Sequence, residues 1–259
     1  MCANLLSLHQ KTKLMRNWYF LPLLFLSVWA KAQSSAWTFH FGPTIATQRW
    51  DNSLERQPLF KWHGAISVES VDNDDDRASL YAQLGYHNKG SATRFAFISQ
   101  IPGQGLFNQF TEEFRFNNIS LQLGAKQKYP WGAASRYFYQ FALRGDYTVS
   151  TNLNELNARN PWAVALYPQE GAVRRWIAGV TVGGGVQWSF GELVGAQFTV
   201  TVSPDLTLQY FSPQVGNIII QDPFGGPNRT TTIPERRIRN VAIEISLGLR
   251  LLRKVVYLD

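Results

Sequence analysis

The sequence predicts an all-β protein, an eight-stranded antiparallel up-and-down transmembrane β-barrel with short periplasmic turns and long extracellular loops. Three observations predict this fold. Apolar and polar residues alternate with a period of two in eight segments, as they do in strands with one apolar face. Short and long connections between these segments alternate along the chain. Aromatic residues gather near both ends of the segments. Each observation is taken in order along the chain below.

An export signal precedes the predicted barrel. Lys11, Lys13 and Arg16 come before an apolar run at residues 18–30, which Ala30 and Ala32 follow at the spacing of a cleavage site. We expect residues 1–32 to form a signal peptide that is cut between Ala32 and Gln33, and residues 33–259 to form one outer-membrane β-barrel domain. The apolar run is shorter than the roughly 20 residues that a spanning helix needs. Translation from Met15 instead of Met1 would give a better-proportioned signal.

Loss of the signal changes the balance of charge. Residues 1–32 hold four of the 25 basic residues and none of the 18 acidic ones, so the mature chain carries 21 basic residues and a net charge of +3. Such a small excess gives little support to a nucleic-acid partner. Cys2, the single cysteine, is also removed. The mature chain therefore has no disulfide, thiolate nucleophile or zinc–thiolate site, and we expect no cofactor.

The alternating segments follow one another through the whole mature chain. The fourth changes its apolar phase at Asn117 and Asn118, which predicts a β-bulge and leaves Phe114 and Phe116 on the outer face. We expect the seventh to continue past Pro204 to Tyr210, and we expect no helix. The "NIII" sequence at 217–220 and the glycine-rich 223–227 are interpreted as loop. The eight segments are residues 37–46, 62–71, 79–87, 114–129, 137–149, 176–190, 193–202 and 240–252.

The connections alternate in length. Brief polar or glycine-containing stretches join the second segment to the third, the fourth to the fifth and the sixth to the seventh. The other connections run to roughly 15 to 30 residues. Both ends of the mature chain fall on the side of the short turns, as in an outer-membrane barrel.

Aromatic residues are expected to form two girdles at the depth of the lipid headgroups. The girdle at the short-turn end would hold Trp37, Tyr129, Trp131, Tyr137, Trp188, Phe190 and Tyr257. The girdle at the long-loop end would hold Trp50, Trp62, Tyr86, Phe114, Phe116, Trp176, Tyr210 and Phe211.

The last segment shows the alternation most clearly. One face is aliphatic throughout, and we expect it to face lipid; its members are Val241, Ile243, Ile245, Leu247, Leu249 and Leu251. The other face is small or charged and would line the lumen. A soluble barrel or sandwich, with the aliphatic face turned inward, is the alternative.

The chain resembles a known family in its strands and turns. The stretches "LYAQLGYHNKGS" (80–91), "FRFNNISLQLGAKQKY" (114–129), "YFYQFALRGDYTVS" (137–150) and "RNVAIEISLGLRL" (239–251) are similar to the PorT-like outer-membrane β-barrel family of the Bacteroidota. The resemblance covers nearly the whole mature chain and implies an outer-membrane barrel. It is specific for architecture and not for activity. The chain departs from the family in lacking a proline in the fourth strand and an aromatic C-terminal residue, so the secretion role of one member does not transfer directly.

Polar residues on the inner face are the candidate site residues. The members that we expect in the lumen are His63, His87, Arg144, Asp146, Glu244 and Arg250. If the turn after the second segment is tight, His63 faces His87 across the strands, as half of a metal site, as a pH-sensitive pair, or simply as two polar lumen residues. We expect His40 to face the lumen as well.

Other motifs leave several interpretations open. The acidic stretch at 71–77 suggests calcium but lacks the glycine and distal glutamate of an EF-hand loop, and a solvated turn explains it equally. His87 beside Asn88, or Asp51 near Trp50, would be ingredients of a hydrolase at the rim of the loops. The long loops also hold arginines beside aromatic and apolar residues, which would suit binding to a partner or to an anionic outer-leaflet glycolipid. These arginines are Arg159, Arg174, Arg175, Arg229, Arg236 and Arg237, and the neighbouring aromatics include Trp162 and Tyr167.

The sequence favours a non-enzymatic integral barrel with an envelope structural, surface-binding or small-solute role. An accessory role in secretion or envelope assembly, and a hydrolase or lipid-modifying enzyme at the loop rim, are the alternatives. We expect outer-membrane lipid as a partner, with envelope or secretion proteins as further candidates and no nucleic acid. The oligomeric state is left open by the sequence.

Overall fold

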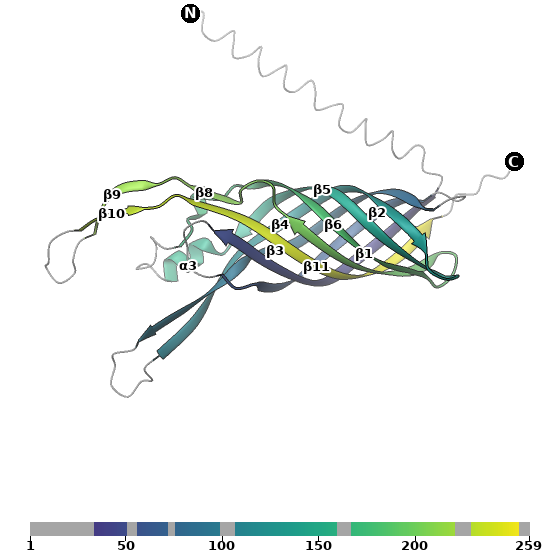
Figure 1. The fold of residues 1–259 in the computed structure, drawn as a ribbon, viewed down its shortest axis with the longest axis horizontal. Helices are drawn as coiled ribbons and strands as arrows, with labels where there is room; N and C mark the ends of the chain where they lie inside the picture. The colour runs from purple at the N-terminus through teal and green to yellow at the C-terminus, as the bar shows by residue number, and fades with distance from the viewer. Residues whose placement is uncertain are drawn as a thin grey trace, which may run out of the picture.

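A computed structural model describes residues 34–50, 56–71, 76–98, 107–159, 167–220 and 229–253. Eight strands, β1 to β7 and β11, pair in sequence order, and β11 also pairs with β1, so the sheet closes into a ring of antiparallel strands (Figure 1). The predicted fold class is therefore confirmed. The signal peptide, its cleavage site between Ala32 and Gln33, and Tyr257 lie outside the described residues.

The strands of the ring are longer than the sequence indicated. Most extend a few residues beyond the alternating segments, and β3 and β4 extend furthest. The ring consists of β1 (Ser34–Trp50), β2 (Leu59–Val71), β3 (Ala78–Ile98), β4 (Phe107–Pro130), β5 (Ser135–Thr151), β6 (Trp176–Ser189), β7 (Val194–Pro204) and β11 (Arg236–Arg253).

The two ends of the ring differ. The turns that join β2 to β3, β4 to β5 and β6 to β7 lie at one end, together with the start of β1 and the end of β11 (Figure 1). At the other end β3 and β4 continue as a paired hairpin to Ile98 and Phe107, well beyond the ring. A second hairpin, formed by β9 (Val215–Ile220) and β10 (Arg229–Ile233), projects from the same end.

Several local predictions are wrong. The seventh strand stops at Pro204, and Tyr210 begins a separate short strand, β8 (Tyr210–Ser212), which pairs with the start of β11. The stretch 217–220 is strand and not loop. The long connection after β5 contains a short helix, α3 (Leu153–Arg159), and a 3-10 turn, η2 (Glu170–Ala172), although no helix was expected. Seven residues are too few for the apolar period of a helix to stand out in the sequence.

The predicted bulge lies at the expected place but on the other strand. The register between β4 and β5 shifts at Asn117 and Asn118, and the extra residue, Val149, belongs to β5. Alternation along β4 is therefore unbroken, so Phe114 and Phe116 point inward with Asn118 and are buried. Their assignment to the outer girdle is wrong, and so is that of the buried Tyr210.

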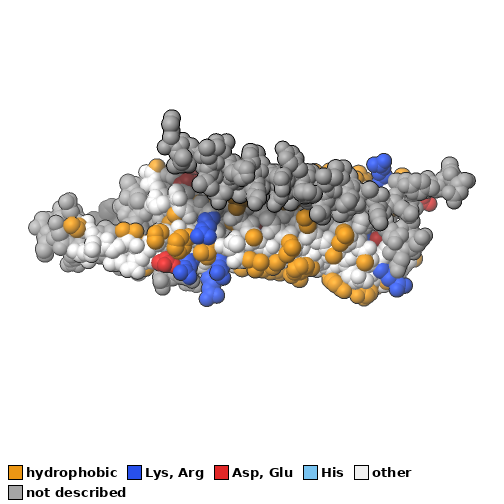
Figure 2. All heavy atoms as spheres, turned by 90° about the horizontal axis from the view of Figure 1, so that it is seen from above, with side chains coloured by type: hydrophobic (Ala, Val, Ile, Leu, Met, Phe, Trp, Pro, Cys, Tyr) orange, Lys and Arg blue, Asp and Glu red, His pale blue; other side chains and the backbone are white. Residues whose placement is uncertain are grey.

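The wall of the ring is apolar outside and polar inside. On β11, Leu247 is 69% exposed and the neighbouring Glu244 and Ser246 are buried. Ile243, Leu249 and Leu251 are exposed like Leu247, while Val241 and Ile245 on the same face are half-buried. Hydrophobic side chains cover much of the visible surface of the ring in Figure 2. A protein with this distribution is stable only where lipid covers the wall and polar groups are satisfied within.

Three consecutive glycines let neighbouring strands approach closely. A Cβ on Gly183 would lie 2.2 Å from the carbonyl oxygen of Val200, and a Cβ on Gly185 would lie 1.9 Å from that of Phe198. Both oxygens belong to β7, against which β6 is paired. The three glycines thus allow close packing of the barrel wall.

Candidate functional site

The lumen holds a network of charged groups at mid-height. Lys89 on β3 donates hydrogen bonds to Asp146 on β5 and Asp205 after β7, each at 2.5 Å from its Nζ. Arg144 contacts the same two carboxylates, with Nη2 2.5 Å from Asp205 and Nε 3.0 Å from Asp146. All four side chains are fully shielded from solvent. The network joins strands from opposite parts of the ring and fills the space between them.

His87 extends this network toward β11. Its Nδ1 lies 2.6 Å from a carboxylate oxygen of Glu244, and its Nε2 lies 3.5 Å from Asp146. The register between β2 and β3 sets His63 directly opposite His87, as predicted. Each ring nevertheless has its own partner, because Nδ1 of His63 contacts the hydroxyl of Thr44 at 3.0 Å.

A second charged cluster occupies the short-turn end. Glu69 on β2 contacts Lys128 and, at 2.9 Å, Lys126 on β4. Lys128 also reaches Asp76 in the first short turn, 2.6 Å away, and Arg136 on β5 contacts the same carboxylate at 2.6 Å. These contacts tie the turn to the lumen and fill this end of the barrel.

Arg250 completes this cluster from β11. Its Nη2 lies 3.9 Å from Glu69, which is too far for a hydrogen bond. The structure thus places all six predicted lumen residues on the inner face, where they are buried. His40 is buried there too, with its Nε2 3.0 Å from the hydroxyl of Ser67.

A packed apolar cap closes the long-loop end. Phe114 and Phe116 of β4 contact Leu153 and Leu156 of α3 and Tyr167, and all five are buried. Trp50 packs against the edge of Phe114, with ring centroids 5.5 Å apart. This cap was not foreseen, because Phe114 and Phe116 were assigned to the lipid-facing side.

Arg56 is held within the cap. Its guanidinium lies over the ring of Trp50, 3.3 Å from the centroid, and it donates a hydrogen bond to Thr93. Burial lowers the pKa of Arg56 to about 9, which leaves the group protonated at neutral pH. The start of β2, the end of β1 and the β3–β4 hairpin are joined through this one side chain.

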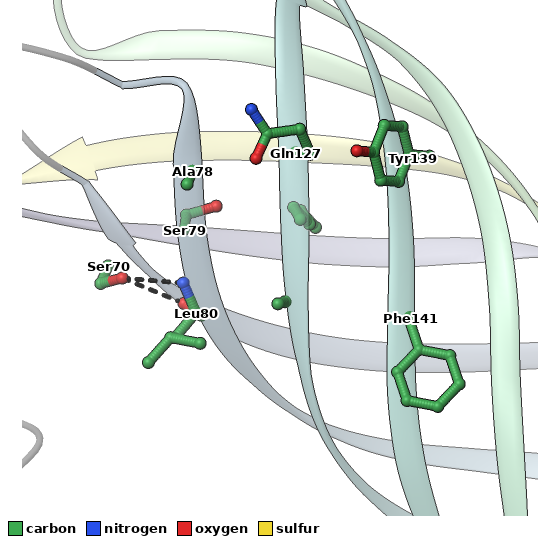
Figure 3. A pocket seen from close by; sticks show the side chains of 9 residues that line it. Ser70, Ala78, Ser79, Leu80, Gln127, Tyr139 and Phe141 are labelled. Carbon is green, nitrogen blue, oxygen red and sulfur yellow. Dashed lines mark hydrogen bonds between the residues drawn. The ribbon is translucent and has the colours of Figure 1, made fainter.

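A groove of about 380 Å³ lies on the outer wall near the short turns. Its lining includes Ala125 and the two residues paired with it, Leu80 on one side and Phe141 on the other. Figure 3 shows Leu80 and Phe141 among the residues that line the groove. Leu80 and Phe141 are exposed on the lipid-facing side of the sheet.

The residues suggested for a hydrolase are not brought together. His87 lies within the lumen between two carboxylates, and Asn88 points to the opposite face of β3. Asp51, Trp162 and most of the acidic 71–77 stretch lie outside the described residues. Within the described ranges no group of three or more His, Cys, Asp or Glu side chains is arranged to hold a metal. No helix in the described part of the chain is long and apolar enough to cross a membrane.

Sequence reasoning missed several members of the two clusters. Lys89 and Asp205 hold the central network together, and Glu69, Lys126 and Lys128 form the second cluster. The period-two alternation indicated that these lysines point into the lumen. Lys89 lies on the same inward face as His87, and Lys126 and Lys128 lie on the same inward face as Gln122. Asp205 was hidden by the expectation that its strand continues.

No protein-family model matches the chain, and no curated protein sequence matches it. The chain is an eight-stranded antiparallel β-barrel, because its ring of strands is closed. Among solved structures, it is similar to Neisserial surface protein A, with 11% identity, a TM-score of 0.43 and coverage of 85% of this chain and 96% of that one.

Two further solved structures are similar to the chain, also at low identity. The outer membrane protein OprG from Pseudomonas aeruginosa has 7% identity and a TM-score of 0.43, with 84% of this chain and 96% of that chain covered. The outer membrane protease OmpT from Escherichia coli has 9% identity and a TM-score of 0.34, with 86% and 98% covered. Identities this low carry no activity from these proteins to this one.

Proposed function

We propose that this protein is a non-conducting, non-enzymatic barrel of the outer membrane that presents a binding surface outside the cell. The observation that carries the proposal is the contrast between its two parts. The lumen is filled by buried ion pairs, while the long-loop end is built up into a packed cap and two projecting hairpins. Residues that do not close the ring are thus concentrated on one side of the membrane.

A small-solute pore fits the lumen less well. Eight-stranded barrels have interiors that side chains normally fill. Here Lys89, Arg144 and Asp205 meet at mid-height with no solvent exposure, and the cap lies above them. A solute would have to displace charged groups from their partners. This displacement costs roughly several kcal/mol for each buried ion.

The long-loop end suits recognition. Loops and hairpins on a rigid scaffold are where binding sites of barrels are usually found. The β9–β10 hairpin exposes Val215 and Ile219, of which Ile219 is 64% exposed. Aliphatic side chains held this far from the ring contribute nothing to its closure, so contact with a partner is the role that remains for them.

The outer membrane is the proposed location, with the short turns in the periplasm and the long loops outside. The signal-peptide pattern and the alternating lengths of the connections support it. The resemblance to the PorT-like family of the Bacteroidota supports it too, and membership in that family stays a prediction. An accessory role in secretion or envelope assembly is the second candidate, and it would place the partner at the short turns.

The test combines conductance with site-specific cross-linking. Purified protein in planar bilayers is expected to give no stable conductance steps. A photo-reactive residue at Ile219 on intact cells is expected to yield adducts with surface or external molecules, and the same residue at Leu247, within the apolar wall, should yield only lipid adducts.

A matched position at the other end separates the two candidates. Trp131 in the second short turn is 60% exposed, close to the 64% of Ile219. Protein adducts at Trp131 and none at Ile219 would favour the accessory role over surface binding. Regular single-channel steps would contradict the proposal that the barrel is closed.

A further inference from the structure

Three arginines lie together on the outer wall at the long-loop end. Arg49 near the end of β1 and Arg237 and Arg239 near the start of β11 are all exposed. They stand on the same outward face as Phe41 and Leu247, because alternate residues of a strand share a face. Basic side chains gather beside the hydrophobic belt at this end in Figure 2.

The strand register places two of these cations directly side by side. Arg49 is the partner of Arg239 across β1 and β11. Directly opposed side chains have Cβ atoms about 5 Å apart, and like charges in this position destabilise the pair. Arg237 is two residues further along the same face, within reach of the other two. Three exposed arginines thus share one face of two paired strands, where the sheet alone would favour opposite charges.

Two other cations at this end have a carboxylate partner. Lys61 lies 2.8 Å from Glu113, and Arg175 lies 3.2 Å from Glu170. In contrast, Arg49 and Arg239 form no ion pair with any residue that the structure describes, and Arg237 pairs with its near neighbour Glu235.

A fourth cation extends the patch along the wall. Phe211 of β8 is paired with Arg237, and the guanidinium of Arg174 lies over the Phe211 ring, 5.5 Å from its centroid. The patch therefore crosses from β1 over β11 to β8. Its positive charge exceeds what Glu235 offsets, so it is complementary to an anion outside the protein.

The depth of the patch identifies the source of that anion. The aliphatic face of β11 ends at Val241, and Arg239 is the next outward residue. On β1 the outward residues after Ile45 are Thr47 and then Arg49. The arginines therefore stand where the apolar belt gives way to the headgroups of the outer leaflet.

We propose that Arg49, Arg237 and Arg239 bind the phosphate groups of outer-leaflet glycolipid. The guanidinium fork donates two parallel hydrogen bonds to a phosphate, and adjacent forks share one phosphate or bridge two. A bound phosphate also removes the repulsion between Arg49 and Arg239. The proposal rests on the outer-membrane location proposed above, and it is independent of what the long loops bind.

The experiment measures glycolipid binding by the purified full barrel. A phosphorylated glycolipid and its phosphatase-treated form are each added to protein in phosphatidylcholine nanodiscs, and bound lipid is counted by native mass spectrometry. We expect wild type to prefer the phosphorylated form. The double variant Arg49→Gln/Arg239→Gln should bind it about a hundredfold more weakly, since each of the two lost charge-assisted contacts costs roughly one order of magnitude.

A matched control removes two other arginines from the same end. Arg115 is half-buried and Arg159 is exposed, and they lie beside Glu113 and Glu155. The variant Arg115→Gln/Arg159→Gln should bind glycolipid as wild type does. Equal losses in both double variants, or equal binding of the two lipid forms by wild type, would overturn the proposal. The proposal would also be overturned if free inorganic phosphate bound to the protein as tightly as the phosphorylated glycolipid and displaced it.

Charge reversal gives a second readout that does not depend on lipid counting. Arg49→Glu creates an opposite-charge pair with Arg239 across the strands, so it should raise the thermal unfolding temperature of the lipid-free protein. The same variant should lose the stabilisation that phosphorylated glycolipid gives to wild type. If this lipid stabilised the Arg49→Glu protein as much as it stabilises wild type, the proposal would be contradicted. This stability assay does not involve the long loops, so its failure leaves the proposed surface-binding role standing.

Discussion

Lys89 carries its charge at a position that water does not reach. Taking an ammonium group out of water costs roughly several kcal/mol, unless nearby charges and hydrogen bonds replace the lost hydration. Asp146 and Asp205 supply both, each at 2.5 Å. Removal of the lysine would leave the two carboxylates with Arg144 as their main remaining cation in the network.

Lys89→Met is expected to lower the free energy of unfolding by about 3–5 kcal/mol, because it leaves a buried charge without its partner. Urea unfolding of the barrel refolded into lipid vesicles measures this. Lys61→Met is the control, since Lys61 forms a partly exposed pair with Glu113 and its loss should cost about 0–1 kcal/mol. Equal effects of the two variants would show that Lys89 is hydrated.

At the scale of the element, β11 has an apolar face on the outside of the barrel and a polar face toward the lumen. Its odd-numbered residues from Val241 to Leu251 are aliphatic and face outward, while Glu244, Ser246 and Arg250 are buried. A shift of one residue in its register would exchange the two sets. Pairing with both β1 and β7 over most of its length fixes the register.

Labelling along β11 tests this directly. A spin label or acyl-chain photoprobe on Ile243, Ile245 or Leu247 is expected to report lipid contact, while labels on Glu244 and Ser246 should not. Ile245→Arg should also cost roughly 2–4 kcal/mol of stability if it lies near the middle of the bilayer. Odd positions shielded from lipid, with even positions open to bulk solvent, would mean that the barrel is turned inside out.

The order of the strands and the face of most residues could be predicted because period-two alternation depends only on local sequence. The β-bulge at Asn117 could also be predicted from the sequence, but local sequence does not tell which of the two paired strands carries the extra residue. The inward position of Phe114 and Phe116 depends on α3 and Tyr167, which are distant in sequence. For the same reason the partners of Lys89 could not be predicted, since Asp205 is 116 residues away.

The whole molecule has a polar interior and an apolar belt, so it is suited to a bilayer and poorly suited to water. Cap, hairpins and the arginine patch lie at one end, and the short turns and second charged cluster lie at the other. This polarity requires a single orientation across the membrane. In our proposal the end with the short turns remains in the periplasm after export.

Cell fractionation tests the location. The mature protein is expected to begin at Gln33 and to separate with outer membranes, because the sequence predicts an export signal before a belt that only lipid can cover. N-terminal sequencing of the purified fraction and density-gradient separation of the two membranes measure both. A soluble periplasmic species that retains residues 1–32 would contradict the location.

Closure of the ring by β1 and β11 has a consequence for assembly. The first and last strands pair from Ser35 with Arg253 to Trp50 with Ile238, so the seam joins residues that are about 200 positions apart in sequence. Contacts this distant in sequence form slowly. Until β11 arrives, the unfinished sheet has two unpaired edges and an apolar surface, which favour aggregation in water. With the outer-membrane location proposed above, we predict that the exported chain needs a holding chaperone in the periplasm and that insertion into the bilayer waits for its last strand.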